Sequence, residues 1–205
     1  MNKPVDDTAA ARHRAKMEKR KAVQDAEVAG KTVEKGLLMV HTGAGKGKST
    51  AAFGLALRML GRGQCIGVVQ FIKGAWHSAE RDALARFGDQ VEWHSMGEGF
   101  TWETQDLARD IAAAGRAWAK ALELMDDPSF GLVILDELNI ALRYDYLDLN
   151  TVVAALTGRR PGLHIVVTGR NAKPELIAAA DLVTEMTLVK HHFAAGVKAQ
   201  PGIEF

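Results

Sequence analysis

A glycine-rich loop with two lysines, at residues 42–50, constrains the fold of this chain more than any other feature. It reads Thr-Gly-Ala-Gly-Lys-Gly-Lys-Ser-Thr. The loop follows an apolar run at 37–40 that predicts a buried strand, and it precedes a helical pattern at 51–60. Glycines let backbone N–H groups turn toward phosphate oxygens, and the start of a helix adds partial positive charge. A strand, this loop and a helix in that order predict a phosphate-binding site.

The side chains of the loop suggest individual roles. Lys48 is the expected contact to the phosphates, and the hydroxyl of Ser49 is an expected ligand of Mg²⁺. Thr42 departs from the usual pattern, which has glycine at that position. The alternative interpretation is a glycine-rich turn that binds nothing. The ATP-binding residues that we expect in the loop are Gly43, Ala44, Gly45, Lys46, Gly47, Lys48, Ser49 and Thr50.

A second candidate motif is the acidic pair Asp136-Glu137, which directly follows the apolar run at 132–135. A carboxylate at the tip of a buried strand, opposite a phosphate loop, can hold Mg²⁺ directly or through water. Asp136 and Glu137 are therefore candidate metal ligands together with Ser49, and either acid can take this role. The alternative is that Asp136 caps a helix.

Further candidates lie near other predicted strand ends. Arg170, in Thr-Gly-Arg at 168–170, could pair with phosphate or form a surface ion pair. Lys73 could contact a ligand or be an ordinary solvated lysine. The loop at 97–104 carries Phe100 and Trp102 between glycines and the longest predicted helix. A flat hydrophobic ligand explains these aromatic residues, and so does a small apolar cluster under the loop.

Strand and helix patterns alternate from residue 36 onward. This alternation predicts an α/β fold, with a mostly parallel sheet, helices on both faces and ligands at the carboxyl ends of the strands. We expect strands at 37–41, 65–71, 91–94, 132–135, 164–168 and 182–186, and helices at 51–61, 78–87, 104–126, 149–156 and 174–180. The expected core positions of the longest helix are Leu107, Ile111, Ala114, Trp118, Ala121, Leu122 and Met125.

Residues 1–35 differ from the remainder, residues 36–205, which we expect to form one P-loop α/β domain. Residues 12–21 carry six Lys or Arg and one Glu. Residues that favour helices dominate, so we expect a helical arm that is mobile without a partner, although a solvated tail fits the composition equally well.

Composition excludes several classes of protein. The formal net charge of +1 gives no overall basic signal for nucleic acid. The single Cys65 rules out an intrachain disulfide, and we expect it to be a buried thiol. No apolar run approaches the ~20 residues of a membrane span, and no secretory signal is evident, so we expect a cytoplasmic protein. His191 and His192 are adjacent, so we expect them to point apart rather than share a metal.

The residues alone therefore lead to a P-loop enzyme or an ATP-driven binding protein whose second substrate is unknown. The alternatives to an enzyme are an ATPase motor or nucleic-acid-linked P-loop protein, and a nucleotide-dependent regulatory module. A series of motifs, in the same order along the chain, resembles the P-loop type of ATP:corrinoid adenosyltransferases from about residue 36 to the end. These motifs are at 42–54, 68–74, 99–102, 135–139, 144–147, 168–170, 189–193 and 196–204. In that family Thr42 is the ordinary start of the loop.

The resemblance implies a RecA-like P-loop NTPase fold and a reaction in cobalamin biosynthesis or salvage. The 5′-deoxyadenosyl group of ATP passes to the Co(I) of a reduced corrinoid, and triphosphate leaves. The cobalt is the nucleophile, so the enzyme needs no general base. ATP lies reversed in the loop, with Mg²⁺ as cofactor and Arg170 among its contacts. The resemblance leaves two corrinoids open as substrate, complete cobalamin and cobyrinic acid a,c-diamide.

The resemblance also assigns catalytic roles and partners. Phe100 and Trp102 match aromatic residues that lie against the lower face of the corrin, where they favour loss of the lower axial ligand and ease reduction of Co(II). The family's N-terminal helix closes over the corrinoid, often across a homodimer, which gives the arm a role. A reduced flavoprotein is the expected electron donor, and no nucleic acid or membrane partner is expected.

Overall fold

The structure is a computed structural model, and it describes residues 7–72, 78–96 and 106–204. The chain divides into two compact units, residues 1–34 and 35–205, each of which is described by itself. Among the described residues, no helix is long and apolar enough to cross a membrane.

The first unit contains one helix, α1 (Asp7–Ala29), whose described side chains are almost all exposed. Ion pairs one turn apart, Lys21 with Asp25 and Lys31 with Glu27, add support along its surface. The N–H of Gly30 donates to the carbonyl of Ala26, which closes the last turn. Residues 7–29 of the arm are therefore helical.

The second unit is built on a six-stranded sheet with the order β3-β2-β4-β5-β1-β6, and every neighbouring pair is parallel. Strand β5 lies between β1, which leads into the phosphate loop, and β4, which ends at Asp136. This order agrees with the RecA-like arrangement that the resemblance implies. The strands are β1 (Leu38–Thr42), β2 (Cys65–Gln70), β3 (Val91–Ser95), β4 (Phe130–Asp136), β5 (His164–Thr168) and β6 (Leu182–Glu185).

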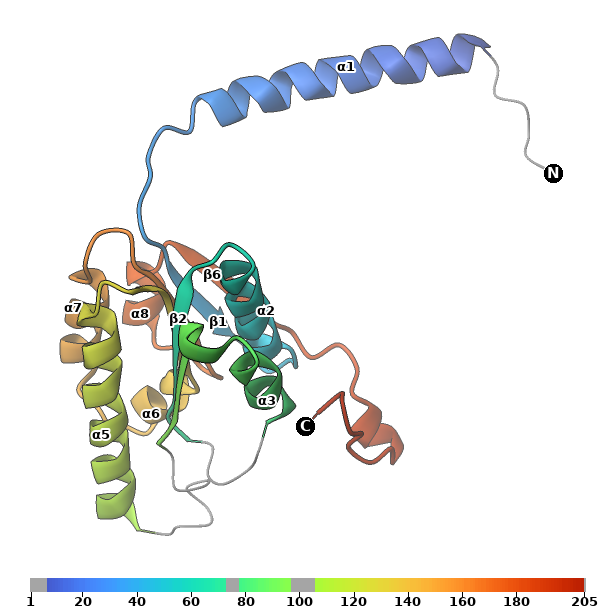
Figure 1. Ribbon diagram of the computed structural model, residues 1–205. Coiled ribbons are helices and arrows are strands. Elements are labelled where there is room, and N and C mark those ends of the chain that lie inside the picture. The colour runs from blue at the N-terminus through green and yellow to red at the C-terminus, as the bar shows by residue number, and fades with distance from the viewer. Residues whose placement is uncertain (1–6, 73–77, 97–105, 205) are drawn as a thin grey trace. The chain divides into compact units, whose positions relative to one another are not determined.

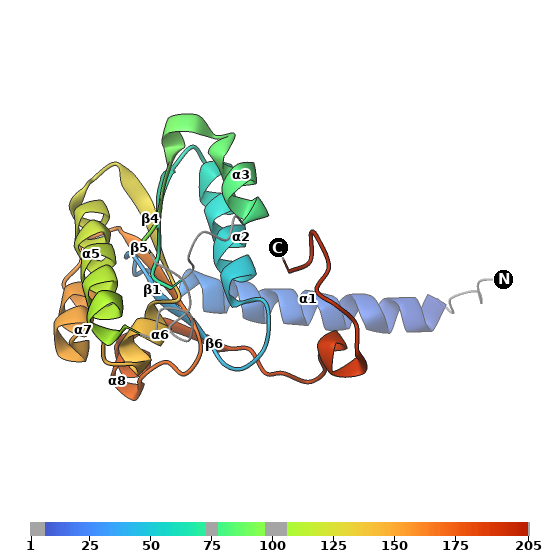
Figure 2. The same cartoon turned by 90° about the horizontal axis from the view of Figure 1, so that it is seen from below.

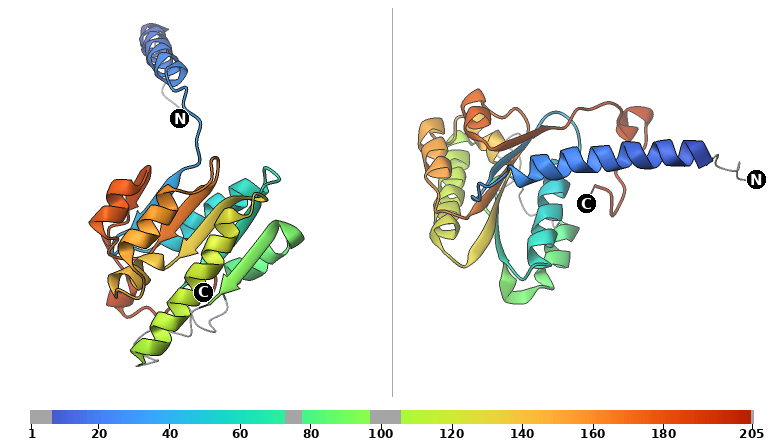
Figure 3. Two further views of the ribbon diagram at one scale, coloured as in Figure 1. Left: turned by 90° about the vertical axis from the view of Figure 1, so that its left-hand side faces the viewer. Right: turned by 90° about the horizontal axis from the view of Figure 1, so that it is seen from above.

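Helices cover both faces of the sheet, as expected (Figure 1). Helices α2 (Lys48–Leu60) and α3 (Ala79–Ala85) lie on one face. The other face carries α5 (Leu107–Asp126), α6 (Leu138–Arg143), α7 (Leu149–Thr157) and α8 (Pro174–Ala179). Figure 2 shows the sheet between these two layers, and the left panel of Figure 3 looks onto the α5, α7 and α8 side. Two separate clusters of buried side chains, one on each face, form the core. Two short 3₁₀ helices, η1 (Gly88–Gln90) and η2 (His192–Ala195), complete the elements.

Expectations about four core residues and one helix need correction, and the first is that Leu122 is only partly buried. Helix α5 begins at Leu107, and both Leu107 and Ile111 are exposed, because the buried side of this helix starts only at Ala113. Its later turns are the ones that pack on the sheet, including the buried Trp118. Cys65 is only partly buried, because it is the first residue of the inner strand β2. Helix α6 was not expected from the sequence.

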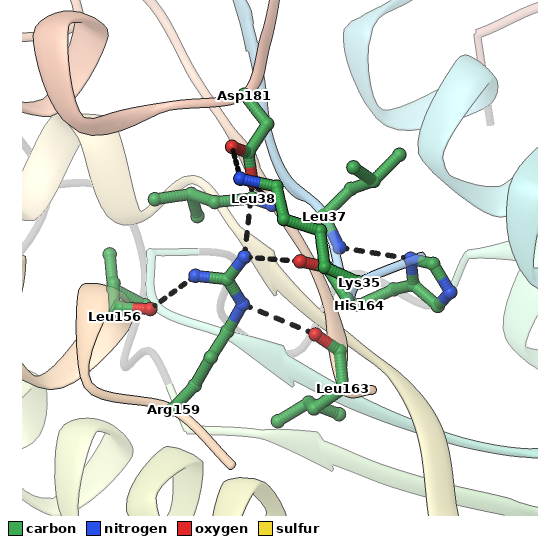
Figure 4. Close-up of polar contacts among 9 residues, drawn as sticks. Lys35, Leu37, Leu38, Leu156, Arg159, Leu163, His164 and Asp181 are labelled. Carbon is green, nitrogen blue, oxygen red and sulfur yellow. Dashed lines mark hydrogen bonds and ion pairs between the residues drawn. The ribbon is translucent and has the colours of Figure 1, made fainter. Parts of the chain in front are cut away.

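A cluster of polar contacts fixes the start of β1 (Figure 4). The guanidinium of Arg159 donates to the carbonyl of Gly36 at 2.5 Å and to Asp181 at 3.1 Å. The other carboxylate oxygen of Asp181 pairs with Lys35, and the N–H of Leu38 donates to Asp181 at 2.9 Å. The point at which the second unit begins is therefore held firmly against β5 and the segment before β6.

Candidate functional site

The loop between β1 and α2 leaves the first helical N–H groups available for an anion. Helices α3, α5 and α7 are capped by the side chains of Ser78, Asp106 and Asp148, but α2 follows Gly47, which has no side chain. Gly47 has φ 102°, a conformation that favours glycine. A phosphate at this helix start would satisfy the free donors and the helix dipole.

Lys48 is folded back over the loop. Its Nζ donates to the carbonyls of Gly43 at 3.0 Å and Gly45 at 2.5 Å, and the residue is 7% exposed. Burial lowers the pKa of Lys48, while the carboxylate of Glu137 opposes this change. The charge of Arg170 lowers that pKa further, so Arg170 lies close enough to affect the same ammonium group.

Asp136 lies opposite the loop and is fully buried. Its Oδ1 accepts hydrogen bonds from Ser49 Oγ at 2.7 Å and Thr168 Oγ1 at 2.8 Å, and its Oδ2 accepts one from Gln70 Nε2 at 2.9 Å. Its carboxylate therefore joins the start of α2 to the ends of β2 and β5. The alternative capping role for Asp136 is wrong, because the residue that precedes α6 as its cap is Glu137.

Polar side chains continue from Asp136 across the carboxyl ends of the strands. The Oε1 of Gln70 accepts hydrogen bonds from Ser95 Oγ at 2.9 Å and from Trp93 Nε1 at 3.2 Å. The register explains this chain, because Gln70 lies beside both Asp136 and Ser95 in neighbouring strands. The network orients the buried carboxylate from the side away from the loop.

Glu137 has a backbone conformation that is uncommon for a residue with a side chain, φ 63° and ψ 20°. Its N–H donates to Thr168 Oγ1 at 3.0 Å. Next to it, Asn139 donates to the carbonyl of Gly169 at 2.9 Å. This turn directs the polypeptide from β4 into α6 and keeps Glu137 and Asp136 on the same edge of the sheet.

The structure also gives Thr42 a structural role. Its Oγ1 accepts a hydrogen bond from the N–H of Ala172 at 3.1 Å, which joins the loop to the segment that follows Arg170. The neighbouring His41 contacts the other end of the loop, because its Nδ1 lies 3.2 Å from the carbonyl oxygen of Lys48. A glycine at position 42 would lack the hydroxyl that makes the first of these contacts.

The candidate residues from the sequence are therefore distributed as follows. Lys48, Ser49, Asp136 and Glu137 lie together, whereas Ala44, Lys46, Thr50 and Arg170 are exposed residues of the same edge. The catalytic candidates Phe100 and Trp102, and also Lys73, lie outside the described residues. Sequence reasoning missed the contributions of Gln70 and Thr168. The signal that could have found them is a polar residue that closes an otherwise apolar buried strand.

The donor set near the loop suits a hard cation such as Mg²⁺. Ser49 and Asp136 present a hydroxyl and a carboxylate oxygen 2.7 Å apart, and Glu137 adds a second carboxylate nearby. Oxygen ligands of this kind are the ones that Mg²⁺ prefers.

His191 and His192 do not point apart, contrary to expectation. Their rings are stacked with centroids 4.8 Å apart, and ligand atoms of both lie within 4.8 Å of one another and of Glu204. However, His191 Nδ1 accepts the N–H of Phe193, so its other nitrogen carries the proton and is a poor metal ligand. Glu204 is already paired with Lys46. We therefore assign no metal to this cluster.

Comparison with known proteins gives a consistent result for both units. A sequence profile described as ATP:corrinoid adenosyltransferase BtuR/CobO/CobP matches residues 34–205. A second profile, described as cob(I)alamin adenosyltransferase N terminal, matches residues 5–28. The similarity therefore reaches further toward the N-terminus than the resemblance noted from about residue 36, and it includes most of α1.

Several curated proteins are similar over nearly their whole length. A corrinoid adenosyltransferase of Pseudomonas aeruginosa is 57% identical over 95% of this chain and 96% of its own. One from Sinorhizobium sp. is 55% identical over 95% of this chain and 92% of its own. The corrinoid adenosyltransferase CobA of Salmonella typhimurium is 45% identical over 95% of this chain and 98% of its own.

Proposed function

Because the chain belongs to the ATP:corrinoid adenosyltransferase BtuR/CobO/CobP family, we propose that the edge of the sheet around Lys48 and Asp136 holds ATP for transfer of its 5′-deoxyadenosyl group to a reduced corrinoid. The observation that carries this proposal is the hydrogen bond between Ser49 and Asp136. It brings the phosphate loop and the buried acid into one site, within a chain whose relatives are named for this reaction.

The proposed roles of the individual residues follow from their contacts. The free N–H groups at the start of α2 and the ammonium of Lys48 bind the triphosphate, and Lys48 must leave the carbonyls of Gly43 and Gly45 to do so. Arg170, whose charge lowers the pKa of Lys48, supplies a further positive charge. Both groups stabilise the negative charge that accumulates on the triphosphate as its bond to C5′ breaks.

Ser49, Asp136 and Glu137 are the residues proposed to hold Mg²⁺, which when bound neutralises part of the triphosphate charge. Thr168 and Gln70 keep Asp136 in place through the hydrogen bonds already described. The described residues thus position ATP and stabilise the leaving group. No protein base is needed, since the cobalt of the corrinoid substrate attacks C5′ itself.

Phe100 and Trp102 are part of the proposal through the family resemblance, as the residues that lie against the corrin. Replacing both by Ala should slow reaction from a Co(II) corrinoid with a flavoprotein reductant much more than reaction from pre-reduced Co(I). Co(I) has already lost its lower axial ligand, so the aromatic residues have less to do there. An equal loss in both assays, with a lowered Tm, would contradict this role.

A homodimer, a flavoprotein electron donor and a cytoplasmic location are also proposed. The homodimer is proposed through the family resemblance, in which the N-terminal helix often closes over the corrinoid across two copies. Light scattering of the purified chain tests the dimer directly.

The decisive experiment for the function is an anaerobic reaction of ATP with chemically reduced cobalamin or cobyrinic acid a,c-diamide. We expect an optical change from formation of the cobalt–carbon bond, with release of one triphosphate for each bond. Lys48→Ala should abolish productive binding of MgATP and hence both signals. Release of ADP would instead indicate phosphoryl chemistry and an ATPase, and no product at all would favour a regulatory module.

A further inference from the structure

The segment that follows β6 returns to the phosphate loop. The N–H of Met186 donates to the carbonyl of Thr42 at 2.9 Å, and the N–H of Gly45 donates to the carbonyl of Met186 at 2.6 Å. Figure 2 shows this segment, in red, running past the loop that leads into α2. The C-terminal residues are therefore a neighbour of the proposed triphosphate site.

Glycine at position 45 permits this approach. A Cβ at Gly45 would lie only 2.6 Å from the carbonyl oxygen of Met186. Real Cβ atoms do not come so close to backbone atoms, so any larger residue would push the segment away from the loop. The contact between the segment and the loop therefore requires glycine at position 45 of the loop.

Further along, the segment brings Glu204 to Lys46. Glu204 Oε2 lies 3.2 Å from Lys46 Nζ, and the other oxygen, Oε1, lies 3.3 Å from His192 Nε2. The backbone N–H of Glu204 donates to the carbonyl of Gln200 at 3.1 Å. The Glu204 side chain is only 16% exposed although it lies at the end of the described chain, whereas Lys46 is 54% exposed.

The two lysines of the loop are therefore held in different ways. Lys48 lies on neutral carbonyl groups inside the loop, and Lys46 is paired with a carboxylate that comes from outside it. A bound triphosphate and Glu204 would compete for the ammonium of Lys46, since both are oxygen anions. A partly exposed ion pair is weak, so a polyanion that offers several oxygens can replace it.

We propose that Glu204 is a positioning residue of the phosphate loop, which holds Lys46 when the loop is empty and gives it up when triphosphate binds. This inference rests on the proposed function, because it takes the triphosphate as the occupant of the loop. Its consequence is that Glu204 weakens the binding of the leaving triphosphate and so favours release of this product.

The test is the affinity of the full chain for inorganic triphosphate, measured by calorimetry without corrinoid. Four proteins are compared: wild type, Glu204→Gln, Lys46→Gln and the double variant. Glu204→Gln keeps the size of the side chain but removes its charge, so triphosphate should bind about two- to fivefold more tightly, the range expected for a partly exposed charge pair. Lys46→Gln should bind it more weakly. In the Lys46→Gln background, Glu204→Gln should have no further effect.

Glu185→Gln is the matched control, because Glu185 is another acid that lies against the loop, at Gly43. The effect of Glu185→Gln on triphosphate affinity should depend less on the presence of Lys46 than the effect of Glu204→Gln does. Unchanged affinity in Glu204→Gln, in a variant whose Tm matches wild type, would overturn the inference. So would a gain in affinity that persists without Lys46, since that would be a general charge effect. Wild type that binds neither triphosphate nor ATP would instead contradict the proposed function, and the inference with it.

Discussion

Asp136 accepts hydrogen bonds from side chains on three different elements, so the effect of changing it can be derived donor by donor. In Asp136→Asn, one carboxylate oxygen becomes an NH₂ group that faces a donor, either Gln70 or the pair of hydroxyls from Ser49 and Thr168. A buried donor left without an acceptor costs about 1–3 kcal/mol. In a chain of this size, that cost lowers Tm by roughly 2–12 °C.

Glu137→Gln is the comparison for this variant, because Glu137 is adjacent in sequence but only partly buried. We expect its Tm to stay close to wild type and the Mg²⁺ dependence of ATP binding to weaken less than in Asp136→Asn. Thermal melts and calorimetry with ATP at several Mg²⁺ concentrations give both quantities. A larger loss of Mg²⁺ dependence in Glu137→Gln would assign the metal to Glu137 instead.

The sequence predicts some residues of this site and not others for a clear physical reason. Lys48, Ser49 and Asp136 belong to local patterns, a loop before a helix and an acid after an apolar strand. Gln70 becomes part of the site only because β2 lies beside β4 in the sheet with Gln70 next to Asp136. Strand order is a property of the whole fold, so a local pattern does not contain it.

At the scale of elements, the contact between the phosphate loop and the end of β6 can be tested with a pair of glycines. Gly45→Ala would place a Cβ 2.6 Å from the carbonyl oxygen of Met186 and should lower Tm. Gly54→Ala in α2 is the control, because the added Cβ has no atom within 4 Å apart from its chain neighbours and the backbone of its own helix. This second change should stabilise the helix by about 1 kcal/mol and raise Tm by roughly 2–4 °C. Equal melting temperatures for the two variants would contradict the close approach.

The starts of β1 and β5 are joined by a hydrogen bond that depends on pH. The N–H of Leu37 donates to His164 Nδ1 at 3.1 Å (Figure 4). Burial lowers the pKa of His164, and the nearby charge of Arg159 lowers it further. Below the ordinary pKa of 6.5 the unfolded chain therefore binds a proton that the folded chain resists. The stability that neutral His164 contributes is complete above this pH and is lost as the pH falls below it.

We therefore expect Tm to fall between pH 7 and pH 5 by less in His164→Gln than in wild type. The pKa of Asp181 is lowered from 3.8 by its hydrogen bonds to Lys35 and Leu38, so this carboxylate does not titrate in the same interval. His13→Gln, a change on the exposed surface of α1, should leave the wild-type pH dependence intact. Parallel Tm curves for wild type and His164→Gln would refute the assignment to His164.

Elements with a strong local pattern were predicted well. The strand His164–Thr168 has the predicted bounds, and the remaining strands differ from them by at most two residues at an end. Helix α6 was missed because its six residues are too short to show a helical period beside the apolar strand that precedes them. The exposed Leu107 and Ile111 were assigned to the core because periodicity identifies the apolar face of a helix but not how far the sheet beneath it extends.

At the scale of the whole molecule, the two units raise the question of what the arm does. The contacts of Arg159 and Asp181 with Gly36, Lys35 and Leu38 all lie within the second unit. Removal of residues 1–30 leaves these contacts in place. We therefore expect the truncated chain, residues 31–205, to fold with a Tm and an ATP affinity close to those of the full chain.

Corrinoid affinity should behave differently in the same truncated chain. A profile described as cob(I)alamin adenosyltransferase N terminal matches residues 5–28, so α1 has a sequence that its family shares rather than that of an arbitrary tail. If the helix covers the bound corrinoid, its loss should weaken corrinoid binding while ATP binding is retained. Optical titration with cobalamin, in the presence of ATP, measures the first quantity, and calorimetry measures the second.

The control is a full-length chain in which residues 8–29 are replaced by a Gly/Ser segment of equal length. This control separates the helix from the mere presence of residues before the core, and it should bind the corrinoid as weakly as the truncated chain. Equal corrinoid affinity in all three proteins would show that α1 is a solvated tail, whereas loss of ATP binding in the truncated chain would show that the second unit depends on the arm to fold.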